Sequence, residues 1–234
     1  MKSTIEIAYH KDVGNGIVIM TTRPEHAAQL EELQKIVFPT LSKESLMRKE
    51  HYLNHIRIFP EGQFVAVKDA RLPALRTTSG GDPDGQGKVI GMTTSIRYHL
   101  DFNDKHTFSD VFDSGFLNTH QPDGDWLYGM DIGTHPDYRG LGIAKFLYDA
   151  RQEAVRKLEL KGQYTYGMLS GYGAVKEAMT AEVYYALLLD GKINDPTVSM
   201  QMKNGFKPFG LVAGYVDDPV CDGYTALLVR NRES

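Results

Sequence analysis

Cysteine is almost absent from this chain, which has a single one, Cys221, among 234 residues. One cysteine excludes an internal disulfide framework and a cysteine-rich metal site, and it fits a reducing compartment. The sequence also lacks a run of about 20 apolar residues, the length that a membrane-spanning helix needs. No apolar signal segment stands near its start, so we expect a cytoplasmic protein.

An excess of one charge is lacking as well. Charged residues make up 24% of the chain, the formal net charge is −4, and no basic tract stands out. We therefore expect neither a nucleic-acid nor a membrane partner. His51 and His55 stand four apart on an expected helix, but they form no His-Glu-x-x-His motif, so we interpret both as surface residues and expect no metal.

Hydrophobic patterning predicts one α+β domain over residues 1–234, with a mixed, mostly antiparallel sheet of six to seven strands flanked by helices. A Gly/Pro/Ser/Thr-rich stretch at about 70–87 predicts a mobile loop, and residues 101–124 are expected to be irregular. A helical insertion is expected at about 170–193. The expected strands are 15–22, 63–68, 88–97, 125–134, 164–169, 206–212 and 224–230, and the expected helices are about 22–37, 42–56, 140–160, 180–189 and 195–203.

The most informative motif joins an expected strand, ending at Thr134, to the long amphipathic helix at 140–160. Between them, residues 139–144 read Arg-Gly-Leu-Gly-Ile-Ala. A helix start leaves about four backbone N–H groups unpaired and carries a partial positive charge, so an anion is stabilised there. Gly140 and Gly142 remove side chains so that an anion can come close, and Arg139 adds a cation. The pattern predicts a site for the pyrophosphate of a nucleotide cofactor.

Other nucleotide motifs do not fit this loop. The Gly-Lys-Ser/Thr of a Walker A motif is missing, and Lys145 stands where a dinucleotide fingerprint needs its third glycine. The remaining pattern, Arg/Gln-x-x-Gly-x-Gly/Ala, is met by Arg139, Gly142 and Ala144. It resembles the acetyl-CoA loop of the GNAT superfamily of N-acetyltransferases. A glycine-rich helix start used only for packing is the alternative, which the strand before the loop and the long helix after it disfavour.

A narrower resemblance covers about residues 55–230. It is to the acetyltransferase module found fused to carbon–nitrogen hydrolases, and it rests on residues 59–64, 123–129, 170–172, 179–182 and 195–206. It implies an acyl-CoA-dependent N-acyltransferase, with acetyl-CoA or another acyl-CoA as co-substrate and a small-molecule or peptide amine as acceptor. The alternative is a non-catalytic acyl-CoA-binding or regulatory module that partners a carbon–nitrogen hydrolase. Whether the chain forms a homodimer stays open.

The resemblance to the superfamily also implies roles for single positions. It places Gln201 where the usual tyrosine protonates the departing CoA thiolate. Glutamine has no titratable proton and can only donate a hydrogen bond, so Tyr172, Tyr184 or Tyr185 is the alternative source of a phenol. The expected cofactor contacts are Ile132, Gly133 and Thr134 for the pantetheine arm, Arg139, Gly140, Leu141, Gly142, Ile143 and Ala144 for the pyrophosphate, and Asn194 for the arm.

Several carboxylates compete for the role of general base, which must take the proton of the attacking amine. The superfamily's glutamate position falls on Tyr128, a poor base at neutral pH. Asp131 is expected on the opposite face of the strand from Tyr128, unless a bulge reverses the alternation. Asp125 and His135 are further candidates. A base is not needed at all if the amine arrives neutral, because proximity supplies much of the rate.

No activated nucleophile stands out in the sequence. Acidic neighbours raise the pKa of the Cys221 thiol, so we expect direct transfer from thioester to amine, without a covalent enzyme intermediate. The insertion near 170–193 lies where the superfamily forms acceptor pockets, and we expect it to shape the choice of acceptor. Asp217, Asp218 and Asp222 form either a solvated turn or a group that attracts a cationic amine.

Overall fold

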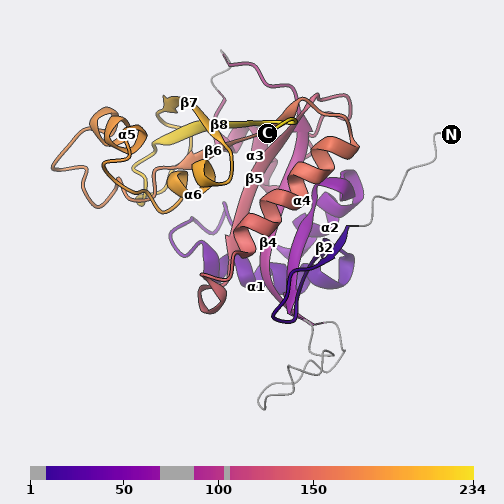
Figure 1. The fold of residues 1–234 in the computed structure, drawn as a ribbon. Coiled ribbons are helices and arrows are strands. Elements are labelled where there is room, and N and C mark those ends of the chain that lie inside the picture. Colours follow the sequence, from indigo (N-terminus) through magenta and orange to yellow (C-terminus); the bar gives the residue numbers. More distant parts are fainter. Residues whose placement is uncertain (1–8, 69–86, 103–105) are drawn as a thin grey trace.

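The computed structural model describes residues 9–68, 87–102 and 106–234 (Figure 1). Their strands form one eight-stranded sheet in the order β1-β2-β3-β4-β5-β6-β8-β7. Among the described strands every neighbouring pair is antiparallel except β5 and β6, which pair in parallel. The expected mixed α+β sheet is confirmed, with one strand more than the predicted maximum. The predicted mobile loop at about 70–87 lies, apart from Gly87, outside the described residues.

The strands are β1 (His10–Asp12), β2 (Ile17–Thr21), β3 (Phe64–Lys68), β4 (Lys88–Tyr98), β5 (Trp126–Thr134), β6 (Gly162–Met168), β7 (Lys207–Val212) and β8 (Thr225–Asn231). The α-helices are α1 (Ala27–Val37), α2 (Lys49–Ile58), α3 (Phe108–Phe112), α4 (Ile143–Lys157), α5 (Ala181–Leu189) and α6 (Val198–Lys203). Short 3-10 turns are η1 (Pro24–His26), η2 (Pro60–Gly62), η4 (Asp113–Gly115) and η5 (Pro136–Tyr138).

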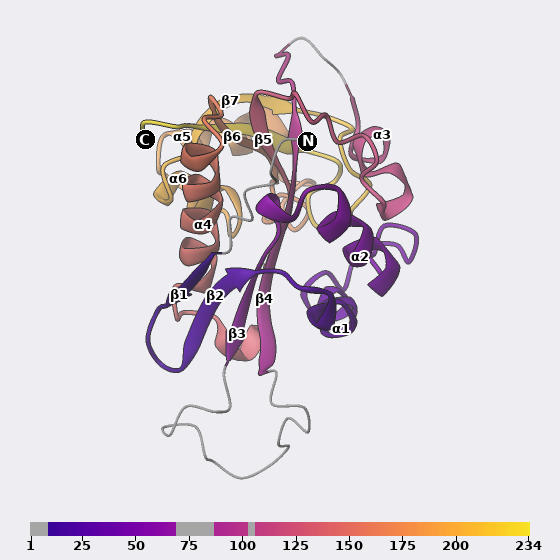
Figure 2. The same ribbon diagram turned by 90° about the vertical axis from the view of Figure 1, so that its right-hand side faces the viewer.

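Helices cover both faces of the sheet (Figure 2). On one face, α4 packs Ile143 and Leu147 against Ile90 of β4. On the other face, Leu30 of α1 and Tyr52 of α2 pack around Met92 of β4. Because helices cover both faces of β4, its residues 89–96 form a continuous buried run rather than an alternating one. Within the described ranges no helix is long and apolar enough to cross a membrane.

The extra strand, β1, forms a hairpin with β2. The turn between them needs left-handed backbone at Gly14, Asn15 and Gly16, with φ of 85°, 52° and 66°. Gly-Asn-Gly supplies that conformation at little cost. The strand itself, His-Lys-Asp, is fully exposed and carries no apolar alternation, so the pattern gave no sign of it.

Helix α2 begins later than predicted, at Lys49 rather than Ser42. Residues 42–47 form turns, and the Ser42 hydroxyl accepts from the Ser45 amide at 3.3 Å. Leu53 of α2 faces solvent and is 39% exposed. The surface positions predicted for His51 and His55 are wrong too, since each is 1% exposed.

These histidines are buried because α2 packs against the segment that follows β4. The His55 Nε2 atom lies 2.6 Å from the carbonyl oxygen of Gly115, and a Cβ on Gly115 would collide with the ring of His51. That segment also contains α3, where irregular structure was predicted. Thr107 and Asp110 cap α3 reciprocally, with the Thr107 amide donating to Asp110 Oδ2 at 2.7 Å.

The two halves of the sheet diverge between β5 and β6 (Figure 1). These strands pair only at Leu127 with Gln163 and at Tyr128 with Tyr164, although β5 continues to Thr134 and β6 to Met168. We call the gap beyond Tyr128 the β5–β6 opening. Strands β6, β8 and β7 lean away with α5 and α6, and α4 begins beside the free end of β5. The fold therefore places an open strand edge next to a helix start.

Candidate functional site

The predicted phosphate loop forms the start of α4, which begins at Ile143 and not at Gly140 as predicted. Gly140 and Gly142 have φ of 80° and 77°, a left-handed conformation that strains other residues. Gly142 is the N-cap and offers no side chain to the helix amides. Among the described residues, the first α4 amide with a backbone partner is that of Phe146, which donates to the carbonyl of Gly142 at 3.1 Å. The preceding amides are thus available to an anion.

Several cations surround this loop. Arg139 is exposed, and Lys145 forms an ion pair with Asp149 at 2.6 Å. Lys68 of β3 and Lys88 of β4 each place Nζ 5.4 Å from the ring centroid of Tyr138. Sequence reasoning missed both lysines, because only the folded sheet brings the ends of β3 and β4 to the turn after β5.

Beside the loop, Ile132, Gly133 and Thr134 line the β5–β6 opening. They pair with β4 on one side, Ile132 with Thr93 and Thr134 with Gly91, and they have no register partner on β6. Their second edge is therefore free to accept an added extended chain in the manner of a strand. The buried Thr134 hydroxyl has no hydrogen-bond partner in the described part of the chain.

A β-bulge lies at the point where β5 leaves β6. Thr94 is opposite Asp131 and Ser95 is opposite Gly129, so Met130 is the extra residue. A bulge reverses the side-chain alternation, and Asp131 accordingly contacts Gln34 of α1 on the face that Tyr128 also occupies. The reversal that the sequence left open is therefore realised.

The bulge also sets the chemistry of Asp131. Its Oδ1 accepts from the Thr94 amide at 2.6 Å and its Oδ2 from Gln34 Nε2 at 2.8 Å. Burial raises the pKa of Asp131 to about 6, against the opposing effects of the Thr94 hydrogen bonds and the Arg151 charge. A carboxyl group that titrates so near neutrality is suited to take a proton from an amine.

The other predicted bases have different surroundings. Tyr128 is fully buried, its hydroxyl bonds to the Tyr215 hydroxyl and lies 3.1 Å from His106 Nε2, and burial raises its pKa well above the ordinary value. It therefore cannot act as a base near neutral pH. Asp125 pairs with Lys161 at 2.5 Å at the opposite end of β5 from the loop. His135 accepts from the Asp137 amide at 3.3 Å and caps η5.

Gln201, the residue at the acid position, lies on α6 and is 3% exposed. A Cβ on Gly167 of β6 would collide with its side-chain oxygen, so the amide lies against the β6 side of the opening. Asn194 is exposed in the turn before α6, which begins only at Val198.

Asp195, next to Asn194, was missed in the sequence and organises this region. Its Oδ1 accepts from the amides of Thr197 and Val198, both at 2.8 Å. Its Oδ2 accepts from the Gly171 amide at 2.9 Å and from the Tyr184 hydroxyl at 3.0 Å. Asp195 thus joins the end of β6, helix α5 and the start of α6, and it engages the phenol of Tyr184 in a structural bond.

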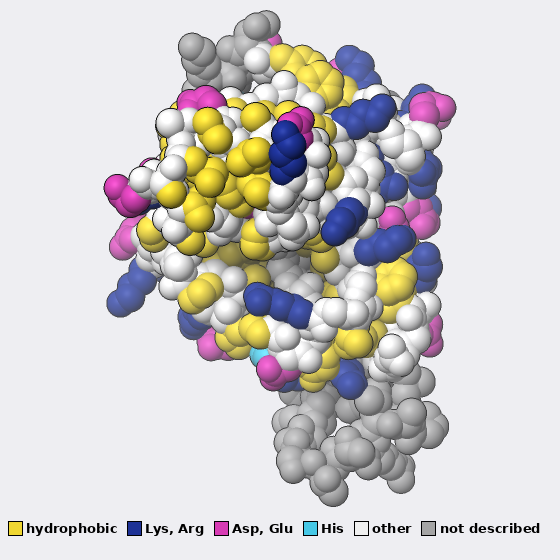
Figure 3. All heavy atoms as spheres, turned by 60° about the vertical axis from the view of Figure 1, so that its left-hand side comes forward, with side chains coloured by type: hydrophobic (Ala, Val, Ile, Leu, Met, Phe, Trp, Pro, Cys, Tyr) yellow, Lys and Arg dark blue, Asp and Glu magenta, His cyan; other side chains and the backbone are white. Residues whose placement is uncertain are grey.

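The surface is hollowed beside the lobe formed by α5, α6 and β7 (Figure 3). Hydrophobic side chains gather on this lobe, and in α5 Val183 and Leu189 are 48% and 43% exposed. Cys221 is fully buried, and burial raises the pKa of its thiol to about 11, so it is no nucleophile. The described residues contain no group of three or more His, Cys, Asp or Glu side chains able to hold a metal.

A glycine-rich helix start beside a splayed pair of strands agrees with a family match. The model of the acetyltransferase (GNAT) family matches residues 69–167. The chain has the GNAT fold, and the matched stretch supports the predicted acetyltransferase domain.

Two curated relatives from Bacillus subtilis (strain 168) resemble this chain. The "Probable hydrolase YhcX" is 31% identical over 217 residues, which are 92% of this chain and 38% of that protein. The "Uncharacterized N-acetyltransferase YkwB" is 29% identical over 203 residues, 86% of this chain and 82% of that protein. The chain thus spans well under half the length of the first relative.

Two solved structures share the fold with a TM-score of 0.71 and 17% identity each. One is the GphF GNAT-like decarboxylase in complex with isobutyryl-CoA, with 92% of this chain and 98% of that chain covered. The other is the loading GNATL domain of CurA from Lyngbya majuscula, with 94% and 99% covered. At this identity the likeness concerns the fold alone.

Proposed function

We propose that this GNAT domain transfers the acyl group of an acyl-CoA, acetyl-CoA being the expected donor, directly to an amine. The observation that carries the proposal is the β5–β6 opening, which leads from the bare start of α4 to Asp131 at the bulge. The start of α4 is suited to bind a pyrophosphate, and Asp131 at the other end is suited to accept a proton. An acyl-pantetheine arm is a ligand that would extend between them.

The cofactor contacts follow from the free backbone groups. The pyrophosphate would lie on residues 139–144, where glycine amides and Arg139 face it, and the arm would pair with residues 132–134. Solved structures of the same fold support this assignment by their ligands. One is described as bound to isobutyryl-CoA, and another, at 13% identity and a TM-score of 0.53, as Naa50 in complex with a bisubstrate analogue CoA-Ac-MVNAL.

Asp131 would act as the general base. As the amine nitrogen attacks the thioester carbonyl, one of its protons passes to the Asp131 carboxylate, directly or through one water. The acceptor would approach from the face of α1 and α2, which Asp131 shares with Tyr128 and Tyr166. Tyr166 stacks on Tyr215 with centroids 4.2 Å apart, which gives this face an aromatic wall. A small-molecule or peptide amine suits such a wall.

A second function is favoured by Gln201, which replaces the usual acid, and by the relative named a probable hydrolase. In it the domain binds acyl-CoA without turnover and regulates a carbon–nitrogen hydrolase partner. Thiol release from acetyl-CoA separates the two functions when a broad panel of primary amines, polyamines and N-terminal peptides is offered. Amine-dependent release supports transfer. Tight acetyl-CoA binding with no release on any amine would favour the regulatory module.

A further inference from the structure

Three buried polar side chains lie on the α4 face of the sheet, beside the β5–β6 opening. Tyr148 and Arg151 come from α4 and Gln201 from α6, and their exposed fractions are 0%, 1% and 3%. Two glycines make room for them on either side of the opening. A Cβ on Gly129 of β5 would collide with the Arg151 guanidinium, and one on Gly167 of β6 would collide with Gln201.

These side chains lack the partners that buried polar groups require. Within the described part of the chain, the Tyr148 hydroxyl, the Gln201 side-chain oxygen and the Nε and Nη2 atoms of Arg151 have no hydrogen-bond partner. Arg151 Nη1 reaches only Thr93 Oγ1, at 3.4 Å. Buried polar atoms are bonded in the great majority of cases, and leaving them unpaired is costly. Such a cluster indicates a polar ligand group that is bound beside it.

The position of the cluster indicates which part of an acyl-CoA would supply this polar ligand group. Thr165 Oγ1 donates to the Gly129 carbonyl at 2.9 Å and closes the apex of the opening. From Ile143 at the phosphate loop, α4 rises about 8 Å to Tyr148 and about 12 Å to Arg151, at ~1.5 Å per residue. An arm that starts at the loop and runs along β5 toward the apex brings its sulfur to this cluster.

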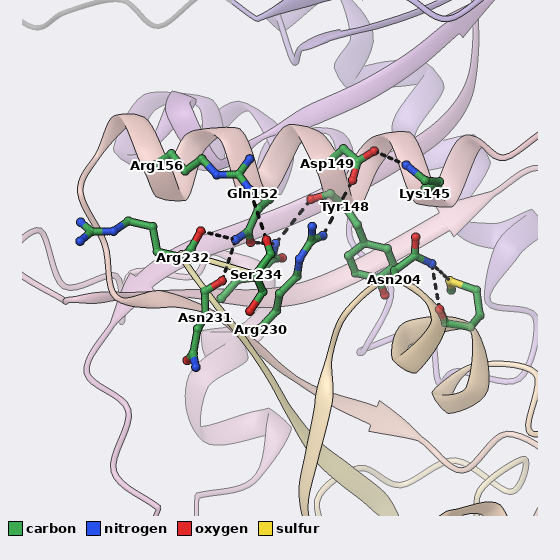
Figure 4. Close-up of polar contacts among 12 residues, drawn as sticks. Lys145, Tyr148, Asp149, Gln152, Arg156, Asn204, Arg230, Asn231, Arg232 and Ser234 are labelled. Carbon is green, nitrogen blue, oxygen red and sulfur yellow. Dashed lines mark hydrogen bonds and ion pairs between the residues drawn. The ribbon is translucent and has the colours of Figure 1, made fainter. Parts of the chain in front are cut away.

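Tyr148 is oriented for such a contact. Its side chain points from α4 toward α6 (Figure 4). The Arg151 guanidinium carbon lies 5.6 Å from its ring centroid. By contrast, the hydroxyl of Tyr184, one of the phenols considered from sequence, already donates to Asp195.

On the basis of the proposed function, we propose that Tyr148 is the proton donor to the CoA sulfur as the acyl group leaves, with Arg151 stabilising the charge that develops there. The amine attacks the carbonyl carbon, the carbon–sulfur bond breaks, and its electron pair stays on sulfur. The Tyr148 proton passes to that sulfur and yields the CoA thiol. The amine proton goes to Asp131, and exchange with solvent restores both groups.

The electrostatics of the cluster agree with this role. Burial raises the pKa of Tyr148, so the phenol keeps its proton in the free enzyme, while Arg151 and the Gln201 amide act in the opposite direction. Burial lowers the pKa of Arg151 only to about 10, so the guanidinium stays cationic at neutral pH. A fixed cation beside the phenol favours loss of its proton when negative charge moves to the sulfur.

The test needs no knowledge of the acceptor. Calorimetry compares the binding of CoA and desulfo-CoA to the wild type, Tyr148→Phe and Tyr172→Phe, from about pH 7 to about pH 9.5, where a growing fraction of a thiol ionises. We expect the wild type to prefer CoA increasingly as pH rises. Tyr148→Phe should lose about 10-fold or more of that preference at high pH, the effect of one hydrogen bond to a charged group.

The controls keep the outcome specific. Tyr148→Phe should bind desulfo-CoA as the wild type does and be at least as stable, since no residue that the structure describes bonds the Tyr148 hydroxyl. Tyr172→Phe, at a buried phenol whose ring packs against those of Tyr184 and Tyr224, should retain the wild-type preference. A wild-type preference in Tyr148→Phe, or no preference in the wild type, overturns the role of Tyr148. A wild type that binds neither compound overturns the proposed function itself.

Discussion

Asp131 shows how one extra residue in a strand changes the chemistry of a side chain. The bulge at Met130 turns Asp131 to the α1 face, where Gln34 and the Thr94 amide bond both of its oxygens. Burial there raises its pKa to about 6. The carboxylate is consequently charged at neutral pH but remains a stronger base than an exposed aspartate.

At the residue scale, the first prediction concerns the rate of acyl transfer. The wild-type rate should fall as pH drops below about 6, because protonated Asp131 accepts no proton. Asp131→Asn should lower kcat/KM by roughly 100-fold or more and abolish that acid limb. Asp125→Asn, at the other end of β5, is the matched control, and its pH–rate profile should retain the acid limb. A pH–rate profile with an unchanged limb in Asp131→Asn would rule out Asp131 as the base.

The same residue makes a prediction about stability. Because the pKa of Asp131 is raised on folding, the folded state holds this proton more tightly than the unfolded chain, whose aspartates titrate near ~3.9. Its contribution to stability is therefore lost as pH rises from about 4 through about 6. The difference in unfolding free energy between Asp131→Asn and the wild type should therefore shift by about 1–2 kcal/mol in favour of the variant between pH 4 and pH 8. Urea unfolding at the two pH values measures this difference, and an equal offset at both would contradict it.

At the element scale, the segment after β4 is fixed to α2 by a contact that tolerates only glycine. Gly115 has φ of 97°, its carbonyl lies 2.6 Å from His55 Nε2, and a Cβ would collide with His51. Gly115→Ala should lose more than about 2 kcal/mol of unfolding free energy. Gly14→Ala, with φ of 85° and open space around it, isolates the backbone strain and should lose about 1 kcal/mol. Equal losses in urea unfolding would show that the collision does not matter.

The elements also show what the sequence could predict and what it could not. The strand–loop–helix from β5 to α4 was predicted well, because glycine, arginine and an amphipathic stripe act locally. Nothing in the sequence singled out Tyr148 and Arg151. Both are nevertheless buried, because β6, β8 and α6 cover the helix on a second side. Gln152 is buried there too and donates to the carbonyls of Asn231 and Arg232 at 2.8 and 3.1 Å.

Long-range contacts account for the remaining surprises. The burial of His51 and His55 depends on a segment some 60 residues away in the sequence. Because the helix itself is polar, its sequence predicted that both histidines lie on the surface. The bulge in β5 is a feature of its pairing with β4, and no single strand encodes it. Lys68, Lys88 and His106 reach the site only through the sheet order. Local pattern thus sufficed to predict a cofactor loop, while the acid and base candidates required the fold.

At the scale of the whole molecule, buried histidines should set the acid limit of stability. Burial lowers the pKa of His55 and of His120 to about 4, below the ~6.5 of an unfolded chain. Their stabilising contribution is complete above about pH 6.5 and is lost as pH falls toward about 4. The urea midpoint of the wild type should accordingly drop between pH 7 and pH 5. The midpoint of the His55→Gln variant should drop less over the same range. A midpoint that stays constant would contradict the burial of neutral histidines.

The central claim is that an acyl-CoA binds from the start of α4 along the β5–β6 opening, and calorimetry with acetyl-CoA tests it most directly. Arg139→Ala combined with Gly142→Asp removes a cation and puts a carboxylate where a phosphate would lie. Gly14→Asp places the same change at a left-handed glycine of the β1–β2 hairpin and controls for backbone strain. We predict tight binding by the wild type and Gly14→Asp, and a loss of about 100-fold or more in the double variant. Binding by the folded double variant at wild-type affinity would contradict the account.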